Sequence, residues 1–437
     1  MYDAIIIGSG PGGYYCAEKI AELGGKSVVI EEDKIGGTCT NIGCIPTKAM
    51  HASAHLVSDI GEASRFGITV SSLKVDFKKL MERKDRIVSM MSRGVQKILV
   101  DGKVEIIAGT GKIKDKNTVI VNDKEIKGKN IVIATGAKPI VFPGVEINNF
   151  VMTSKELLSL EKLPKSLIII GGGYIGCEFA SIFAALGTKV TIVELMDRIV
   201  SIEDEDISTE LTNTMTRAGI EILTNTKFEK VSGKKVMVTG SDGEKELSAD
   251  KVLFAVGVKS NLDIEELDAI KIKYDKGIKV NDKMQTNVSS IYAVGDVTEG
   301  IKLAHYAYAQ AEVAAHNIMG KKMVFDQTVV PSCIFTLPEI ASVGVRNSKM
   351  KSVSFPFAAN GKARSMNKPR GFVKIYYEKG YLKGFAAIGP HVSDMVSEAT
   401  LAIKNNLKLE DIKNTIHPHP TLPEAFLDAV KMALKNK

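Results

Sequence analysis

The succession of strand, glycine turn, helix, strand and acidic residue occurs twice in this 437-residue chain, and it restricts the fold more than any other feature. The first copy opens with the apolar run DAIII at 3–7 and closes with SVVIE at 27–31. Its glycines have the spacing GxGxxG: Gly8, Gly10 and Gly13. Glycines so placed let the backbone turn tightly and approach a pyrophosphate at a helix N-terminus. Glu31, which is 18 residues past Gly13, stands close to where a ribose-binding acid is expected.

The second copy runs from SLIII at 166–170 to KVTIVE at 189–194. Its glycines repeat the same spacing: Gly171, Gly173 and Gly176. Glu194 again lies 18 residues past the third glycine. Such a repeat implies two bound nucleotides or one duplicated fold. The alternative is a degenerate copy that is retained only for packing.

Two of the five cysteines, Cys39 and Cys44, lie close together in the run GGTCTNIGCIPTK at 36–48. The other three have apolar neighbours and are expected to be buried: Cys16, Cys177 and Cys333. Five scattered cysteines do not form a secreted disulfide framework, whereas a close pair in a reducing compartment is more often catalytic or metal-binding. A zinc site is the weaker alternative, because there is no second cysteine pair and His51 and His55 complete no known ligand spacing. No metal is therefore expected.

Composition and charge exclude several classes of function. The net charge of +7 is small for this length, and no block of like charge resembles a nucleic-acid-binding arm. No apolar run reaches the ~18 residues that a membrane-spanning helix needs. The N-terminus MYDAIIIGSG lacks the basic region and cleavage site of a signal peptide. We expect a cytoplasmic protein with neither a nucleic-acid nor a membrane partner.

Periodicity divides the rest of the chain. Residues 74–100 are expected to form a long amphipathic helix, with apolar residues at helical spacing: Leu80, Ile87, Met91, Val95 and Ile98. IVIATG at 131–136 and VLFAVG at 252–257 both predict a strand that enters a glycine turn. From about Asp326 alternating segments such as FVKIYY at 372–377 predict an antiparallel sheet with helices, which would be a separate C-terminal domain.

Four segments together make the chain resemble the pyridine nucleotide–disulfide oxidoreductases, over nearly its whole length. They are the thiol run at 36–48, TNVSSIYAVGD at 286–296, PSCIFTLPEIASVG at 331–344 and HPHPTLPEAF at 417–426. The resemblance implies an α/β fold, with two doubly wound nucleotide-binding domains and an α+β C-terminal dimerisation domain. The implied divisions are 1–144 for FAD, 145–257 for NAD, 258–325 as a central segment that completes the FAD site, and 326–437 as the interface domain.

The resemblance also implies the role of each site residue. Cys39 would exchange with the substrate, and Cys44 would face the flavin. His419 would be the base, oriented by Glu424. His417 would either cap the chain or support the site.

Lys48 and Glu178 resemble the family's buried ion pair beside the flavin ring, the alternative being two solvated helix residues. The implied cofactor-binding residues are Lys48 with Gly8, Gly10, Gly13, Glu31, Gly136 and Asp296 for FAD, and Gly171, Gly173, Gly176, Glu194 and Gly257 for NAD. Glu194 favours NAD over NADP, because a carboxylate accepts both ribose hydroxyls but repels a 2′-phosphate.

Within the family, the motifs are most similar to those of the members that oxidise dihydrolipoamide to lipoamide. The implied enzyme is an FAD-dependent homodimer in which the base of one subunit serves the Cys39–Cys44 disulfide of the other. Its implied partner is dihydrolipoamide or a lipoyl-bearing protein of a multienzyme complex. Another NAD(P)H-dependent disulfide reductase is the alternative, and a non-enzymatic flavoprotein is a weaker one.

The chain departs from the family pattern at three places. Pro418 and Pro423 stand where smaller residues are common, and GVKSN at 257–261 replaces a run that usually carries arginine and proline. These changes bear on the nicotinamide site and on loop shape, and they leave the thiols, the base and both glycine turns intact.

Overall fold

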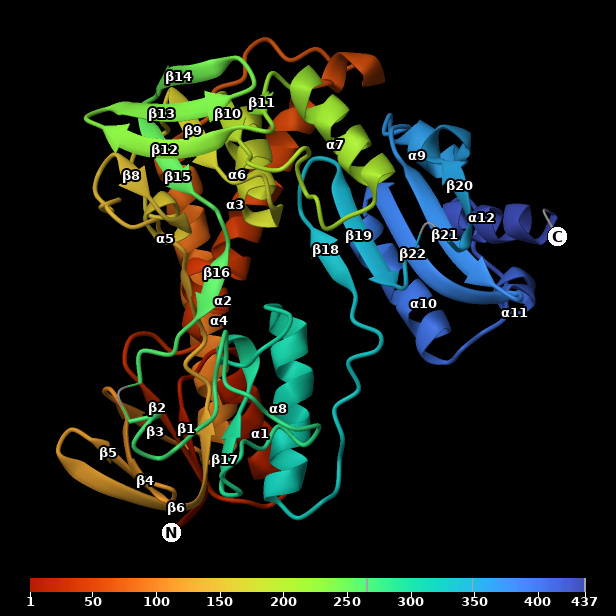
Figure 1. Cartoon of the computed structure of the whole chain (residues 1–437). Helices are drawn as coiled ribbons and strands as arrows, with labels where there is room; N and C mark the ends of the chain where they lie inside the picture. Colours follow the sequence, from red (N-terminus) through yellow and green to blue (C-terminus); the bar gives the residue numbers. More distant parts are fainter. Residues whose placement is uncertain (265, 348, 436–437) are drawn as a thin grey trace.

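The computed structural model describes residues 1–264, 266–347 and 349–435. Two domains with parallel sheets lie one above the other, and a third domain with an antiparallel sheet lies beside them (Figure 1). The fold class expected from the sequence is thus confirmed. No helix of the described residues is long and apolar enough to cross a membrane.

The first domain is built on a sheet whose parallel strands lie in the order β3-β2-β1-β6-β17, with β5 and β4 continuing antiparallel from β6. Its strands are β1 (Tyr2–Ile7), β2 (Ser27–Glu31), β3 (Glu105–Ala108), β4 (Lys112–Asp115), β5 (Thr118–Val121), β6 (Lys124–Ile133) and β17 (Ile291–Ala293). The last four residues of β1 are buried, as is usual for a central parallel strand covered on both faces. Helix α1 (Pro11–Glu22) packs against α8 (Ala304–Ile318), so the chain returns to this domain after the second one.

The second domain repeats this design with the parallel order β11-β10-β9-β15-β8. Its parallel strands are β8 (Val151–Met152), β9 (Ser166–Ile170), β10 (Lys189–Val193), β11 (Glu221–Leu223) and β15 (Lys251–Phe254). Its helices are α5 (Ser154–Leu157), α6 (Tyr174–Ala185) and α7 (Glu205–Arg217), and an antiparallel sheet is formed by β12 (Lys227–Ser232), β13 (Lys235–Gly240) and β14 (Gly243–Ser248).

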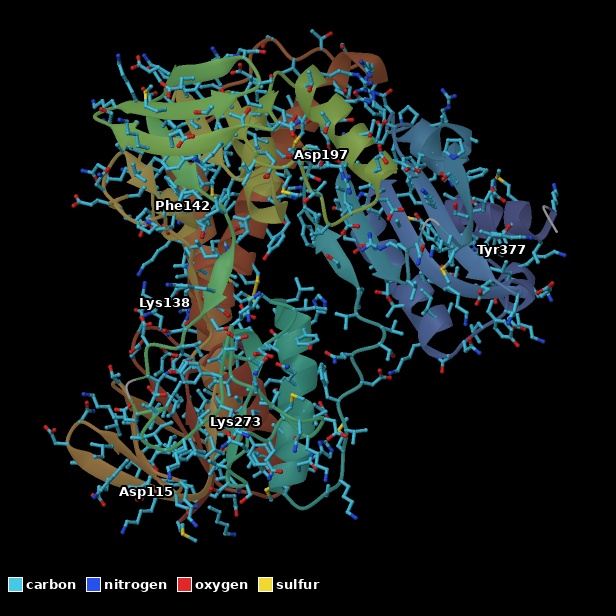
Figure 2. The ribbon with its side chains drawn as sticks, in the orientation of Figure 1. Asp115, Lys138, Phe142, Asp197, Lys273 and Tyr377 are labelled. Carbon is cyan, nitrogen blue, oxygen red and sulfur yellow. A yellow bond between two sulfur atoms is a disulfide. The ribbon has the colours of Figure 1, made fainter. Side chains whose placement is uncertain are left out.

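Two antiparallel strands, β7 (Ala137–Pro139) and β16 (Val258–Ser260), carry the chain between these domains. Lys138 marks this crossing in Figure 2, and Phe142 marks the point where the chain reaches the second domain. There the Phe142 ring stacks on Phe228 and meets Phe254 edge-on. The linker is therefore anchored by aromatic packing.

Three helices follow β2 in the chain: α2 (Gly37–Ile42), α3 (Cys44–Gly61) and α4 (Phe77–Asp101). The amphipathic helix expected at 74–100 is present, although it begins three residues later. Its buried stripe includes Leu80 and Val95, whereas Met91 is exposed. Helix α3 packs on both α4 and α6, and this joins the first domain to the second.

The C-terminal domain has an antiparallel sheet in the order β18-β19-β22-β21-β20. Its strands are β18 (Ser332–Ile334), β19 (Glu339–Gly344), β20 (Lys351–Pro356), β21 (Phe372–Glu378) and β22 (Tyr381–Gly389). Its helices are α9 (Gly361–Ser365), α10 (Val392–Lys404), α11 (Leu409–Asn414) and α12 (Glu424–Lys435), and it contains the short 3₁₀ turn η3 (Phe357–Ala359). Two further 3₁₀ turns, η1 (Ala63–Phe66) and η2 (Gly295–Val297), lie earlier in the chain.

A buried group of charges fixes the C-terminal sheet to the second domain. Glu203, whose side chain is 1% exposed, accepts from Ser342 (3.1 Å) and pairs with Arg346. Next to it Asp204 accepts from Tyr376, and Lys374 pairs with Asp206 at 2.7 Å. Buried charges are tolerated only when they are paired and hydrogen-bonded, so this group sets how the two domains meet.

Replacing Arg346 with methionine should destabilise the protein by about 3–5 kcal/mol, because it leaves the Glu203 carboxylate buried without its cation. Urea unfolding measures the loss. The double variant Arg346→Met with Glu203→Gln should recover part of it, since the amide has no charge to compensate. Equal losses in the single and double variants would mean that the pairing itself is unimportant.

Candidate active site

The two glycine turns have the same geometry. Gly8 and Gly171 have positive φ values of 101° and 106°, and a Cβ on either would lie within 2.5 Å of the carbonyl oxygen of the residue that follows a neighbouring strand. A Cβ on Gly13 would meet the Gly8 oxygen at 1.9 Å, and one on Gly176 would meet the Gly171 oxygen at 2.0 Å. The first and third glycines of each turn are therefore required by the fold itself.

The middle glycines, Gly10 and Gly173, are different. Each has ordinary extended backbone angles just before its helix, and a Cβ on either would meet no atom within 4 Å. Neither strain nor packing explains glycine there. Open space over the backbone at the N-terminus of a long helix suits a diphosphate, so both turns fit a dinucleotide.

The acids at the strand ends hold these turns. Oε2 of Glu31 accepts from the backbone N–H of Ser9 (2.8 Å) and from its hydroxyl (2.5 Å). Oε2 of Glu194 accepts from the N–H of Gly172 at 2.5 Å. Each carboxylate is thus fixed at the residue after the first glycine, beside the place where a ribose would lie.

The redox pair lies directly beside the first turn. Cys39, in α2, and Cys44, the first residue of α3, form a disulfide with their Cα atoms 4.7 Å apart. A Cβ on Gly37 would meet the Cα of Gly10 at 2.6 Å, so α2 begins against the glycine turn. The Ser9 hydroxyl also accepts from the N–H of Gly36 at 3.1 Å. These contacts place the disulfide next to the dinucleotide seat.

Lys48 lies one turn after Cys44 on the same face of α3. Its ammonium donates to Glu178 on α6 at 2.8 Å and lies 4.3 Å from the centre of the Phe335 ring. Glu178, whose side chain is 9% exposed, also accepts from the N–H of Phe335 at 2.9 Å. The Lys48 side chain remains 34% exposed, so the ion pair is partly buried, and with Phe335 it joins all three domains.

Asp296 lies in η2, at the end of β17. Burial raises the pKa of its carboxyl group, although Lys302 lowers it. Gly136 and Gly257, both with positive φ, directly precede β7 and β16, the two strands that cross between the domains. A Cβ on Gly12 would meet the Val294 side chain at 3.0 Å, so the Asp296 turn adjoins the first glycine turn.

The base motif points into solvent. The His419 side chain is 79% exposed, and its Nδ1 donates to Oε1 of Glu424 at 2.9 Å. A carboxylate can only accept, so Nε2 remains as the nitrogen that can take a proton. The Thr421 N–H, and then His419, hold the pKa of Glu424 below its usual value. His419 is therefore oriented so that Nε2 can accept a proton from a group that approaches from solvent.

His417 is tied down on both sides. Its Nδ1 meets the carbonyl oxygen of Thr415 at 3.0 Å, and its Nε2 meets Oε1 of Glu398 on α10 at 2.9 Å. Only 5% of the side chain is exposed. His417 therefore braces the loop that carries His419 and is not available as a base.

Three residues that contact the predicted site residues were missed by the sequence reasoning. Ser9, Phe335 and Glu398 each contact a residue that was predicted, but only Ser9 and Phe335 stand inside a recognised motif. Among the free cysteines, Cys16 and Cys177 are buried as expected, whereas Cys333 is only partly buried. His51 meets the Thr336 carbonyl, and the described residues contain no group of three metal-binding side chains.

The family model described as pyridine nucleotide-disulphide oxidoreductase matches residues 2–311, and the model of its dimerisation domain matches residues 330–430. The chain belongs to this family and forms a homodimer through the C-terminal domain. It is an oxidoreductase that uses FAD and a pyridine nucleotide, which agrees with the shape of both glycine turns.

Curated relatives that match this chain over nearly the full length of both proteins include dihydrolipoyl dehydrogenases. The one from Chlamydia pneumoniae is 40% identical over 99% of this chain and 97% of its own, and one from Bacillus subtilis is 38% identical over 99% and 98%. Among solved structures, LpdA from Mycobacterium tuberculosis has a TM-score of 0.91 at 26% identity, covering 98% of this chain and 99% of its own. The HOCl-induced flavoprotein disulfide reductase RclA from Escherichia coli has a TM-score of 0.89 at 28% identity, covering 99% and 100%.

Proposed function

We propose that this protein is a dihydrolipoamide dehydrogenase, which oxidises dihydrolipoamide to lipoamide and reduces NAD⁺. The observation that carries the proposal is the Cys39–Cys44 disulfide held against the first glycine turn. Full-length relatives of that name, at 36–40% identity, support it over the alternative of another disulfide reductase. FAD supplies the two-electron acceptor that returns the dithiol to the disulfide and passes the electrons to NAD⁺.

The thiol chemistry balances within the chain. One substrate thiolate attacks Sγ of Cys39, and the Cys39–Cys44 bond breaks as a mixed disulfide forms. The second substrate thiolate then displaces Cys39 and closes the lipoamide disulfide. Two electrons thereby pass to Cys39 and Cys44, and the protons lost by the substrate thiols need an acceptor.

His419 of the partner subunit is the proposed acceptor. Thiols with a pKa near 8.5 are mostly protonated at neutral pH, so a base that titrates there speeds the exchange. Within one chain His419 faces solvent, which suits a base that completes the site of the other subunit. Glu424 fixes the ring and stabilises the imidazolium.

Lys48 and Glu178 are proposed to lie beside the flavin ring. The Lys48 ammonium, restrained by Glu178 and by the Phe335 ring, would stabilise negative charge there. The proposed domain divisions remain 1–144, 145–257, 258–325 and 326–437. A cytoplasmic location and a lipoyl-bearing protein as partner belong to the same proposal.

Steady-state assays test the function. Dihydrolipoamide, free and attached to a lipoyl domain, is compared with the NADH-dependent reduction of glutathione disulfide and other small disulfides. Dihydrolipoamide should have the highest kcat/KM by at least tenfold. A higher value for another disulfide would replace this proposal with the alternative.

Glu194 is proposed to select NAD⁺ over NADP⁺ by at least about tenfold, which corresponds to ~1.4 kcal/mol. Glu194→Arg should narrow this ratio, because it removes the repulsion of the 2′-phosphate. The control Glu194→Gln keeps an acceptor for the Gly172 N–H but removes the charge, so it should narrow the ratio less. Equal use of both cofactors by the unmodified protein would contradict the assignment.

A further inference from the structure

Two residues that the family motifs do not include lie together beside Asp296. Ser260 is part of the run GVKSN, where the family usually has arginine and proline, and Lys302 lies just before α8. The Lys302 ammonium donates to the Ser260 hydroxyl at 2.9 Å and to the carbonyl oxygen of Thr298 at 2.7 Å. The Ser260 hydroxyl in turn donates to the carbonyl oxygen of Asp296 at 2.8 Å.

The groups that hold Lys302 are themselves rigid. Ser260 and Thr298 are buried, and the Thr298 hydroxyl donates to the Gly295 carbonyl at 2.8 Å. Gln310, 1% exposed on α8, accepts from the Gly295 N–H at 2.7 Å and donates to the Thr298 hydroxyl. A long flexible side chain is thus fixed in one place, which costs side-chain entropy.

One N–H of the Lys302 ammonium has no hydrogen-bond acceptor among these contacts. An ammonium has three donors, and two are used among the described residues. Burial lowers the pKa of Lys302, although Asp296 and Glu299 raise it. Among the described residues, Lys302 is linked to Asp296 through the Ser260 hydroxyl, which donates to the backbone carbonyl oxygen of Asp296.

The position of this charge relative to the first glycine turn follows from the segment that carries Asp296, because a Cβ on Gly12 would meet the side chain of Val294 at 3.0 Å. Burial, and then the charges of Asp296 and Glu178, raise the pKa of Tyr174 at the start of α6. Glu178 pairs with Lys48, one helical turn from Cys44. Lys302 lies two residues before α8, which packs against the helix α1 that follows the first glycine turn, and Lys48 lies in α3 (Figure 1).

We propose that Lys302 is an FAD-binding residue, which directs its remaining N–H to the ribityl and flavin part of FAD. The acceptors there are hydroxyl and carbonyl oxygens, and a charge-assisted hydrogen bond from an oriented ammonium is stronger than a neutral one. Ser260 positions the ammonium, because its hydroxyl accepts from Lys302 and donates to the backbone carbonyl oxygen of Asp296. The inference rests on the FAD cofactor of the family and not on the identity of the thiol substrate.

The experiment measures the dissociation constant of FAD from purified full-length holoprotein, from the fluorescence of released FAD on dilution. Lys302→Met should raise this constant by about tenfold or more. Lys302→Arg keeps a cation and should recover most of the affinity, and Ser260→Ala should have an intermediate effect. Lys321→Met, at an exposed position three residues after α8, is the matched control and should change nothing.

Displacement of FAD by ADP locates the contact. ADP carries the diphosphate but not the flavin, so its own dissociation constant should be the same in Lys302→Met as in the parent. An equal loss for ADP would overturn the proposal, as would an FAD constant within twofold of the parent. If Lys302→Met does not fold, the comparison of Ser260→Ala and Lys302→Arg with the parent decides. Because no thiol substrate is used, the outcome is independent of the proposed dehydrogenase activity.

Discussion

Replacing His419 with glutamine is expected to slow the oxidation of dihydrolipoamide by about 10²–10⁴-fold, the usual effect of removing a general base. Glutamine can still donate to Glu424, but it cannot take a proton at neutral pH. FAD should stay bound, because His419 lies in the C-terminal domain and contacts neither glycine turn. Turnover and the FAD content of the purified variant measure both outcomes. His391→Asn, at another exposed histidine of the same domain, is the control and should keep near-normal activity.

Mixing experiments test whether His419 acts across the dimer. Homodimers of Cys44→Ser and of His419→Gln should each be inactive or nearly so. In a heterodimer both lesions fall in one composite site, and the other site has its disulfide from the His419→Gln chain and its base from the Cys44→Ser chain. About half the activity of an unmodified dimer should return. If subunits exchange but no activity returns, the base acts within its own chain.

The sequence predicted best what is encoded locally. In each glycine turn the strand, the three glycines and the following helix are contiguous, so their spacing fixes the geometry that Gly8, Gly13, Gly171 and Gly176 adopt. The family resemblance carried the prediction further, to the fold class and to the disulfide.

Contacts between distant segments could not be predicted in the same way. The hydrogen bond from the Phe335 N–H to Glu178 and the one from Lys302 to Ser260 join residues that are far apart in the sequence. The packing of domains brings these residues together, so no periodic pattern in the sequence predicts the contacts. The partial burial of Cys333 has the same origin, since its apolar neighbours in sequence do not fix what covers the strand.

Substitution of Gly176 by alanine is expected to destabilise the second domain, whereas substitution of Gly173 by alanine should leave it folded and abolish tight NAD⁺ binding. A methyl group on Gly176 would lie 2.0 Å from the carbonyl oxygen of Gly171, so α6 must move away from β9. Such overpacking costs about 1–3 kcal/mol or more, and urea unfolding measures it. On Gly173 the same methyl group meets no protein atom within 4 Å, and the backbone angles of −74° and −174° suit alanine.

The methyl group of Gly173→Ala would therefore clash with a ligand bound over this turn and not with the protein. Equilibrium titration with NAD⁺ should show a dissociation constant raised at least about tenfold, with FAD content unchanged. Gly10→Ala is the matched variant in the first turn and should weaken FAD binding while sparing NAD⁺, because its backbone and its empty surroundings are the same. Unchanged NAD⁺ affinity in Gly173→Ala would mean that no diphosphate lies over this turn. The second glycine fingerprint would then be a copy that serves packing alone, since only its first and third glycines are required by the fold.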